Sequence, residues 1–418
     1  MPELALRQGE CQRAATRSGR LDHNDGVDTD LLAALRTTEG AAALAAAAEV
    51  SGGDPLVAAA GLRSRGVAPA LASAALTQAD LRRRAGAKFG PGAATMFFTR
   101  AGLEQATRAV VADRRAARLR AAGVDTLADL GCGLGADALA AARAGIRVYA
   151  VDADPLTAAL ARANAEAAGL ADLITVDCAD AQGVDVTTYD AVFADPARRR
   201  SGGGRVFDPR SYSPPWDFVA GLADRVPRTV LKLAPGIDHA LLPPGAEGQW
   251  VSVDGDLVEA AFWCGPLAGA PRRATLLRAS GASELTGDGV TRAPVGPPGA
   301  HLYDPDPAVV RAHLVAEFAA TVDGRLADPD IAYVYTDAPA ATPYGRGFTV
   351  TDVLPFSLKR LRILLRERGV GRLEILKRGS ALEPEQLRRD LRPSGPNAAS
   401  LVLTRVAGAP TTLICRPH

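Results

Sequence analysis

The sequence predicts an α/β protein built around an open parallel β-sheet. Between residues 124 and 195, four short apolar segments alternate with alanine-rich stretches that favour helices, an order typical of βαβ units. Each apolar segment carries an acidic residue at its carboxyl end. No strand is predicted before residue 120, and helices and strands are mixed after residue 299. We therefore expect an all-α part before the sheet and an α+β part after it.

Length and composition limit the class of protein. The chain has 418 residues, is 47% hydrophobic and carries a formal net charge of +1, so two or three domains are expected and the charge neither indicates nor excludes nucleic acid. The five cysteines form no C-x-x-C pair and no secretory signal is evident. We expect reduced thiols in a cytoplasmic protein, with no metal site. No apolar run approaches the roughly eighteen residues that span a bilayer, so no membrane partner is expected.

The N-terminal part is predicted to be helical. Residues 1–27 are polar without periodicity, which predicts a flexible N-terminus, and residues 28–119 form a helical domain with a linker helix. Thr38 and Thr77 are candidate N-caps, and Thr99 is expected to cap a helix from Ala101 to Arg118. Phe98, just before that cap, either packs into the core or helps to cover a ligand site, and the sequence leaves both roles open.

The turn after the first strand carries the strongest ligand signal. It reads Asp129-Leu-Gly-Cys-Gly-Leu-Gly-Ala-Asp137, so three glycines stand between a strand and a helix N-terminus, where the backbone can approach a ligand. The second strand, Arg147–Asp152, ends in an acid that can accept hydrogen bonds from ribose hydroxyls. Dinucleotide sites favour G-x-G-x-x-G, whereas this spacing is G-x-G-x-G. Asp129 would repel a pyrophosphate but can hold an amino group, which favours S-adenosylmethionine over NAD.

Together these motifs resemble a class I S-adenosylmethionine-dependent methyltransferase. The resemblance implies a Rossmann-like seven-stranded domain over residues 120–280, with later strands at 228–236, 249–253, 257–263 and 273–277, the last three forming an antiparallel edge. It also implies the following cofactor-binding residues: Asp129, Gly131, Cys132, Gly133, Gly135, Asp137, Asp152, Ala153, Asp180 and Ala181.

The fourth strand ends in a motif that points to methyl transfer. Methyltransferases of amino nitrogens often carry Asn/Asp-Pro-Pro-aromatic here, where the acid and the proline carbonyl accept from the target amino group and the aromatic ring stacks on a base. Asp195 and Pro196 match, whereas Ala197 and Arg198 depart from the pattern. The predicted catalytic residues are Asp195, Pro196 and Arg198, whose guanidinium replaces the aromatic plane unless Phe207, Tyr212 or Trp216 does.

Two further segments near the predicted cofactor turn are expected to contact the substrate. Arg198, Arg199 and Arg200 begin a basic, glycine-rich loop suited to a phosphate backbone. Phe98 and Thr99 resemble Phe-Thr elements of RNA methyltransferases similar to the cap trimethylguanosine synthases, which close over the cofactor.

Residues 281–298 are predicted to form a linker.

The C-terminal part, 299–418, resembles the THUMP-like domain of certain bacterial methyltransferases. The resemblance lies in Tyr303–Pro307, Leu354–Lys359 and Glu374–Gly379. THUMP domains bind RNA, so it implies an RNA partner (tRNA or rRNA), with Lys377 and Arg378 as phosphate contacts. The expected function is direct methylation of an RNA base. Alternatives are a methyltransferase for a protein or small molecule, with this domain structural or dimerising, and a non-catalytic RNA-binding protein.

Overall fold

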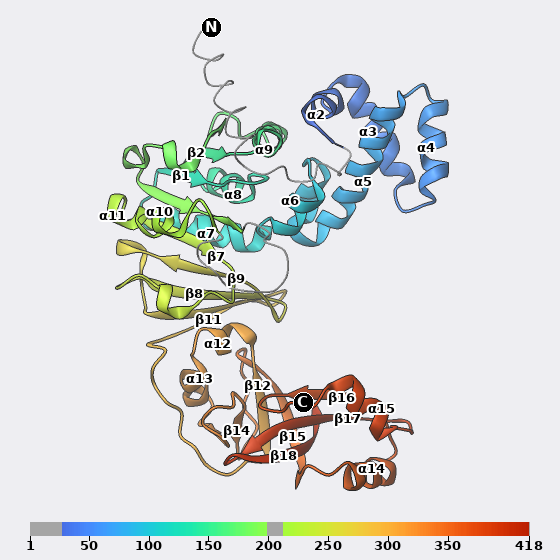
Figure 1. The fold of residues 1–418 in the computed structure, drawn as a ribbon, viewed down its shortest axis with the longest axis vertical. Coiled ribbons are helices and arrows are strands. Elements are labelled where there is room, and N and C mark those ends of the chain that lie inside the picture. Colours follow the sequence, from blue (N-terminus) through green and yellow to red (C-terminus); the bar gives the residue numbers. More distant parts are fainter. Residues whose placement is uncertain (1–26, 199–211, 418) are drawn as a thin grey trace. The chain divides into compact units, whose positions relative to one another are not determined.

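The structure is a computed structural model that describes residues 27–198 and 212–417. It divides into two compact units: unit 1 runs to Leu233 and includes Trp263–Leu267, and unit 2 holds Ala234–Phe262 and the chain from Ala268 onward (Figure 1). These units do not follow the predicted borders at 120, 281 and 299, which stay predictions. The predictions for residues 1–26, Arg199, Arg200 and Phe207 lie outside the described residues.

Unit 1 begins with the predicted helical region. Its elements are α2 (Thr29–Leu35), α3 (Thr38–Val50), α4 (Pro55–Ser64), α5 (Pro69–Phe89) and the 3₁₀ turn η1 (Gly90–Ala94). The cap of α3 is Thr37, whose hydroxyl accepts from the Gly40 amide, so Thr38 was placed one residue late. Thr77 caps nothing, because α5 continues through it on a face of buried alanines. No single described helix is long and apolar enough to cross a membrane, although α2 and α3 satisfy those criteria together as a bent pair.

The predicted helix from Ala101 to Arg118 is wrong, because the structure has two helices there. They are α6 (Arg100–Gln105) and α7 (Ala109–Ala121). The Lys88 ammonium donates to the carbonyl oxygens of Leu103 and Glu104, both at 2.7 Å, and of Ala106 at 3.2 Å. Carbonyls at a helix C-terminus lack intrahelical partners, and a lysine that satisfies them stabilises the end of α6.

The parallel sheet of unit 1 is confirmed. Strands β1 (Thr126–Leu130), β2 (Arg147–Asp152), β3 (Ile174–Cys178), β4 (Ala191–Ala194) and β7 (Thr229–Leu233) lie in the order β3-β2-β1-β4-β7, and each neighbouring pair is parallel. Helices α8 (Ala136–Arg143) and α9 (Pro155–Ala167) connect the first three strands. The carboxyl ends of the strands therefore meet at one edge, where such sheets bind ligands. Short elements complete this part: η2 (Ala181–Gly183), η3 (Val186–Thr188), β5 (Ala197–Arg198), β6 (Tyr212–Ser213), α10 (Trp216–Ala220), α11 (Leu222–Arg225) and η6 (Gly265–Leu267).

The complete sheet has nine strands instead of the seven expected. The remaining elements are η5 (His239–Leu241), β8 (Glu247–Val253), β9 (Asp256–Trp263), β10 (Arg272–Arg278) and β11 (Gly281–Gly287), and the strand order is β11-β10-β8-β9-β7-β4-β1-β2-β3. β10 runs parallel to β8, so a wholly antiparallel edge was wrong. β11 occupies the start of the predicted linker: a two-residue turn at Ala279 and Ser280 folds it antiparallel onto β10, where Leu285 is buried. Pairing with β10 makes a strand from a glycine- and serine-containing segment that resembles a loop in sequence.

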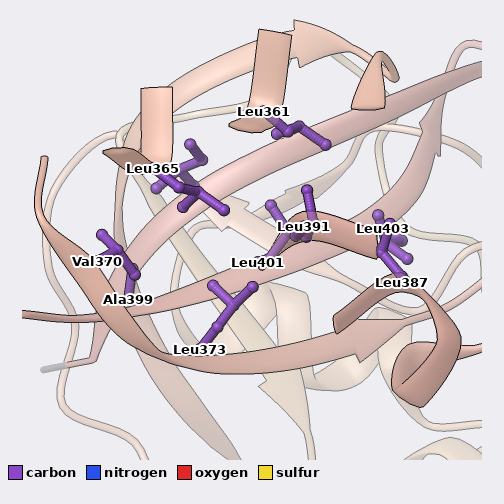
Figure 2. Close-up of a cluster of buried hydrophobic side chains, with 10 residues drawn as sticks. Leu361, Leu365, Val370, Leu373, Leu387, Leu391, Ala399, Leu401 and Leu403 are labelled. Atoms are coloured by element: carbon purple, nitrogen blue, oxygen red, sulfur yellow. The ribbon is translucent and has the colours of Figure 1, made fainter. Parts of the chain in front are cut away.

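The C-terminal α+β arrangement is confirmed. A seven-stranded sheet in the order β13-β14-β12-β15-β18-β17-β16 carries four helices. The bounds are β12 (His301–Pro305), α12 (Pro307–Arg311), α13 (Val315–Thr321), β13 (Arg325–Leu326), β14 (Val334–Thr336), β15 (Gly345–Pro355), α14 (Leu358–Glu367), β16 (Val370–Lys377), α15 (Pro384–Leu391), β17 (Asn397–Val406) and β18 (Ala409–Pro417). Figure 2 shows Leu361, Leu365, Leu387 and Leu391 of α14 and α15 packed on buried side chains of β16 and β17.

Candidate active site

The glycine turn between β1 and α8 needs glycine at three positions. Gly131, Gly133 and Gly135 have φ angles of 87°, 55° and 80°, in the region that side chains rarely adopt. A Cβ at Gly131 would lie 2.9 Å from the backbone oxygen of Asp195. Glycine therefore lets the turn pass directly against the end of β4, which brings the predicted cofactor turn and the predicted acceptor motif together.

Asp129 is a buried carboxylate. Its exposed fraction is 0%, and among residues 27–198 and 212–417 neither carboxylate oxygen has a hydrogen-bond partner. Burial, with the charges of Asp137 and Asp195, raises the pKa of Asp129 well above its usual value, against the opposing effect of Arg115. A buried polar group with no partner is costly and calls for an explanation. A cationic group, such as the amino group of S-adenosylmethionine, fits this position; a pyrophosphate does not.

Strand β2 ends at Asp152, as predicted. The Asp152 oxygens accept from the amides of Gly133 at 3.1 Å and Asp154 at 2.9 Å. Burial raises the pKa of Asp152 to about 6, although both hydrogen bonds oppose the shift. Each carboxylate oxygen can still accept a second hydrogen bond, as ribose hydroxyls would require. Ala153 next to it is exposed.

The end of β3 contributes an exposed carboxylate to the same edge. Asp180 accepts from the Gln182 amide at 2.9 Å, and Ala181 behind it is buried. The charge of Asp195 opposes ionisation of both Asp129 and Asp152, so these carboxylates are close enough to interact. Their combined field favours a cationic ligand.

Asp137 is committed to a contact with α7. It accepts from the Thr107 hydroxyl at 2.6 Å and forms an ion pair with Arg115, whose guanidinium lies 4.7 Å from the Phe193 ring centroid. These contacts tie α8 to α7, and they do not favour the predicted cofactor role of Asp137. The sequence held no signal for the Arg115 partner.

The cysteine predictions are partly correct. Cys132, in the turn, is free and buried, and burial raises its pKa well above the usual value, so it fills space as an unreactive thiol. Cys264 and Cys415 are also free and buried. Cys178 is disulfide-bonded, so the prediction of reduced thiols is wrong for this residue. Cys11 lies outside the described residues.

Two side-chain amides hold the segment from Phe97 to Thr99. The Asn164 side chain accepts from the Phe97 amide at 2.7 Å and donates to the carbonyls of Phe97 at 3.1 Å and Leu134 at 3.0 Å. Gln78 exchanges a similar pair of hydrogen bonds with the backbone of Phe98. Phe98 has no exposed surface, which favours its core role over a substrate contact. The Thr99 hydroxyl accepts from the Gly102 amide and caps α6.

The motif at the end of β4 contacts a residue that was not predicted from the sequence to be functional. The Lys232 ammonium lies 2.5 Å from Oδ2 of Asp195. Ala194 on β4 is in register with Leu231 on β7, so the residues that follow them are neighbours at the carboxyl edge. A lysine inside the apolar strand Thr229–Leu233 was the available signal. Pro196 is buried.

The predicted stacking residues are only partly described. Arg198 lies in the short strand β5, without a described side chain. Tyr212 is buried, and its ring centroid lies 6.2 Å from that of the half-buried Trp216. Trp216 therefore keeps the accessible ring surface that a stacking platform needs.

Lys377 and Arg378 belong to unit 2 and have partners there. Lys377 forms an ion pair with Glu383 at 2.8 Å, and Arg378 pairs with Asp304 at 2.9 Å beneath the ring of Tyr333. Lys377 is exposed, whereas Arg378 is half-buried. These contacts favour a structural role for Arg378.

Comparison with known proteins gives matches along most of the chain. Residues 127–197 match a methyltransferase domain, residues 345–417 a THUMP domain-like family, and residues 28–85 a domain of unknown function. Proteins of Mycobacterium tuberculosis strains CDC 1551 and H37Rv, each named an uncharacterized S-adenosylmethionine-dependent methyltransferase, are 37% identical over 354 residues, covering 81% of this chain and 95% of theirs. The crystal structure of a putative methyltransferase from Porphyromonas gingivalis W83 has the same fold, with a TM-score of 0.71 and 21% identity over 93% of this chain and 98% of that chain.

Proposed function

The chain belongs to the S-adenosylmethionine-dependent methyltransferases, and from that premise we propose that it methylates a base in RNA. One observation carries the proposal: the Asp195 backbone lies against Gly131 of the cofactor turn, 2.9 Å from the position of a Cβ. A group held by Asp195 is therefore next to a ligand held by the turn. Placing two reactants in attack geometry is the main source of rate enhancement in such a displacement.

The residues of unit 1 divide between two tasks. Asp129 and the glycine turn hold the methionine part of the cofactor, Asp152 its ribose and Asp180 its adenine amino group. Bound there, S-adenosylmethionine would supply an electrophilic methyl group on its sulfonium. The acceptor oriented by Asp195 would take this methyl group through its lone pair and lose a proton to solvent, leaving a neutral thioether. Asp195 and the Pro196 carbonyl orient the acceptor group.

Support for RNA comes from the C-terminal match. Residues 345–417 match the THUMP domain-like family. The resemblance of this part to THUMP domains, which bind RNA, supports an RNA acceptor. Exposed cations on α14, among them Lys359 and Arg366, offer phosphate contacts. A protein or small-molecule acceptor is the alternative.

The test is methyl incorporation. Purified protein is incubated with radiolabelled S-adenosylmethionine and total RNA from a strain that lacks the gene, with and without ribonuclease. Label that ribonuclease removes supports the proposal, and digestion to nucleosides identifies the methylated base. Label that resists ribonuclease, or no label in RNA despite cofactor binding measured by calorimetry, contradicts it.

A further inference from the structure

The closest charged contact of the acceptor motif is a lysine from the neighbouring strand. Lys232 projects from β7 and meets Oδ2 of Asp195 at 2.5 Å. The lysine side chain is 12% exposed and that of Asp195 is 35% exposed, so the ammonium lies behind the carboxylate and the carboxylate faces outward. Exposed ion pairs contribute little, but a largely buried cation beside one carboxylate fixes that carboxylate strongly.

The contact occupies one oxygen of Asp195 and leaves the other for a ligand. Oδ2 is bound by Lys232, and no hydrogen bond to Oδ1 exists among the described residues. The Asp195 amide donates to the Leu130 carbonyl at 3.1 Å, so the backbone of the residue is also fixed. The pair thus presents a single carboxylate oxygen in a set direction at the edge of the sheet.

The other nearby lysine has a different task. Lys88 carries a pKa lowered by burial and by the charges of Arg108 and Lys232, so it lies within the electrostatic reach of Lys232. Its ammonium, however, donates to three carbonyls at the end of α6. Lys88 therefore stabilises the end of α6, whereas Lys232 contacts the carboxylate of Asp195.

We propose that Lys232 is a positioning residue that fixes the orientation of the Asp195 carboxylate, so that Asp195 accepts a hydrogen bond from an amino group of the base that is methylated. This proposal rests on the proposed function and names its acceptor class. Oδ1 of Asp195 can accept a hydrogen bond from the N–H of an amino group. An amino group attacks through its lone pair and loses its proton afterwards, so during attack it needs a hydrogen-bond acceptor that orients it.

The experiment compares variants of the full-length protein on total RNA from the strain that lacks the gene. The variants are Lys232→Met, Lys232→Arg, Asp195→Asn and the double variant Asp195→Asn/Lys232→Met. Arg147→Met is the control, because Arg147 is an exposed cation at the opposite end of the parallel strands. The readouts are kcat at saturating S-adenosylmethionine, the KM for RNA, cofactor affinity by calorimetry and the identity of the methylated nucleoside.

We expect Lys232→Met to lower kcat about 100-fold with cofactor affinity and the KM for RNA within about twofold of wild type, and Lys232→Arg to restore at least about tenfold. The double variant should be no slower than Asp195→Asn alone, because the proposed effect of the lysine on turnover passes through that carboxylate. The unchanged cofactor affinity also shows that the variants are folded. The label should lie on an amino nitrogen of a base.

Three results overturn the inference alone: an unchanged kcat in Lys232→Met, a double variant slowed by the product of the two single effects, or a base methylated at an atom other than an amino nitrogen. If wild type labels no RNA, or labels a ribose oxygen, the proposed function fails and the inference fails with it. Loss of cofactor binding in Lys232→Met would make the lysine a part of the cofactor site and would also refute the assigned role.

Discussion

Cofactor affinity is predicted to depend on pH through Asp152. Burial raises the pKa of this carboxyl from 3.8 to about 6 in the free protein. In the proposed site ribose hydroxyls donate to the ionised form, so the ligand is expected to bind the protein in which Asp152 has lost its proton. Below about pH 6 the ionised fraction falls tenfold per pH unit, and the dissociation constant is expected to rise by the same factor. Binding near pH 5 should be about tenfold weaker than near pH 7.5.

The same shift has a consequence for the free protein. A raised pKa means that folding favours the neutral form of the Asp152 carboxyl. The stability that this neutral form contributes is fully present below pH 3.8 and is lost as the pH rises through about 6. A shift of about two units corresponds to roughly 3 kcal/mol at neutral pH. Ligand hydroxyls that bond to the carboxylate recover part of this cost, which is how a buried acid gains affinity for its ligand.

The assay is calorimetry with S-adenosylmethionine at about pH 5, 6 and 7.5 on wild type and Asp152→Asn. We expect the wild-type dissociation constant to change about tenfold across this range and the variant to bind weakly with a flatter profile. Asp129 is present in both proteins, so the difference between the two profiles belongs to Asp152. Profiles of equal slope would refute the reasoning.

Three further predictions concern the cofactor turn and its support. Asp129→Asn should weaken cofactor binding at least about tenfold, since a charged hydrogen bond contributes roughly 1.5–3 kcal/mol, while the melting temperature of the free protein stays equal or rises; calorimetry and thermal melting check both. Gly131→Ala should cost about 1–2 kcal/mol for its φ of 87° and also displace Asp195. Gly133→Ala, in open space at 55°, should cost only the backbone strain, so equal turnover of the two alanine variants would contradict the contact. Asn164→Leu removes three buried hydrogen bonds. It should lower the free energy of unfolding by about 2–4 kcal/mol and weaken cofactor binding. An unchanged unfolding curve in denaturant would exclude this role.

The parts of the site that were predictable from sequence are local. The turn from β1 to α8 has positive φ angles at three positions, and each of them holds a glycine, the residue that adopts such angles most easily: Gly131, Gly133 and Gly135. Asp152 sits at the end of its own strand, so a period-two apolar pattern and one acid were enough to place it. Short-range rules of this kind also gave the alternation of strands and helices.

The parts that were missed depend on partners far along the chain. Lys232 and Asp195 are 37 residues apart, and only the register of β4 on β7 makes them neighbours. The family resemblance of the glycine turn implied a cofactor role for Asp137, but Arg115, 22 residues earlier, binds it. The break between α6 and α7 likewise depends on a distant lysine, which propensity alone does not reveal.

Asn164 makes the cofactor turn and the N-terminal helices a thermodynamically linked pair. One side chain binds the Leu134 carbonyl of the turn and the backbone of Phe97, and the next residue along is held by Gln78 of α5. Thermodynamic linkage is reciprocal. If the folded helical region makes the free energy of ligand binding to the turn more favourable, then ligand binding stabilises the helical region by the same free energy. Hydrogen exchange in α5 should therefore slow when the cofactor binds. Substitutions in residues 28–85, far from the glycine turn in sequence, would then be read out as changes in cofactor affinity.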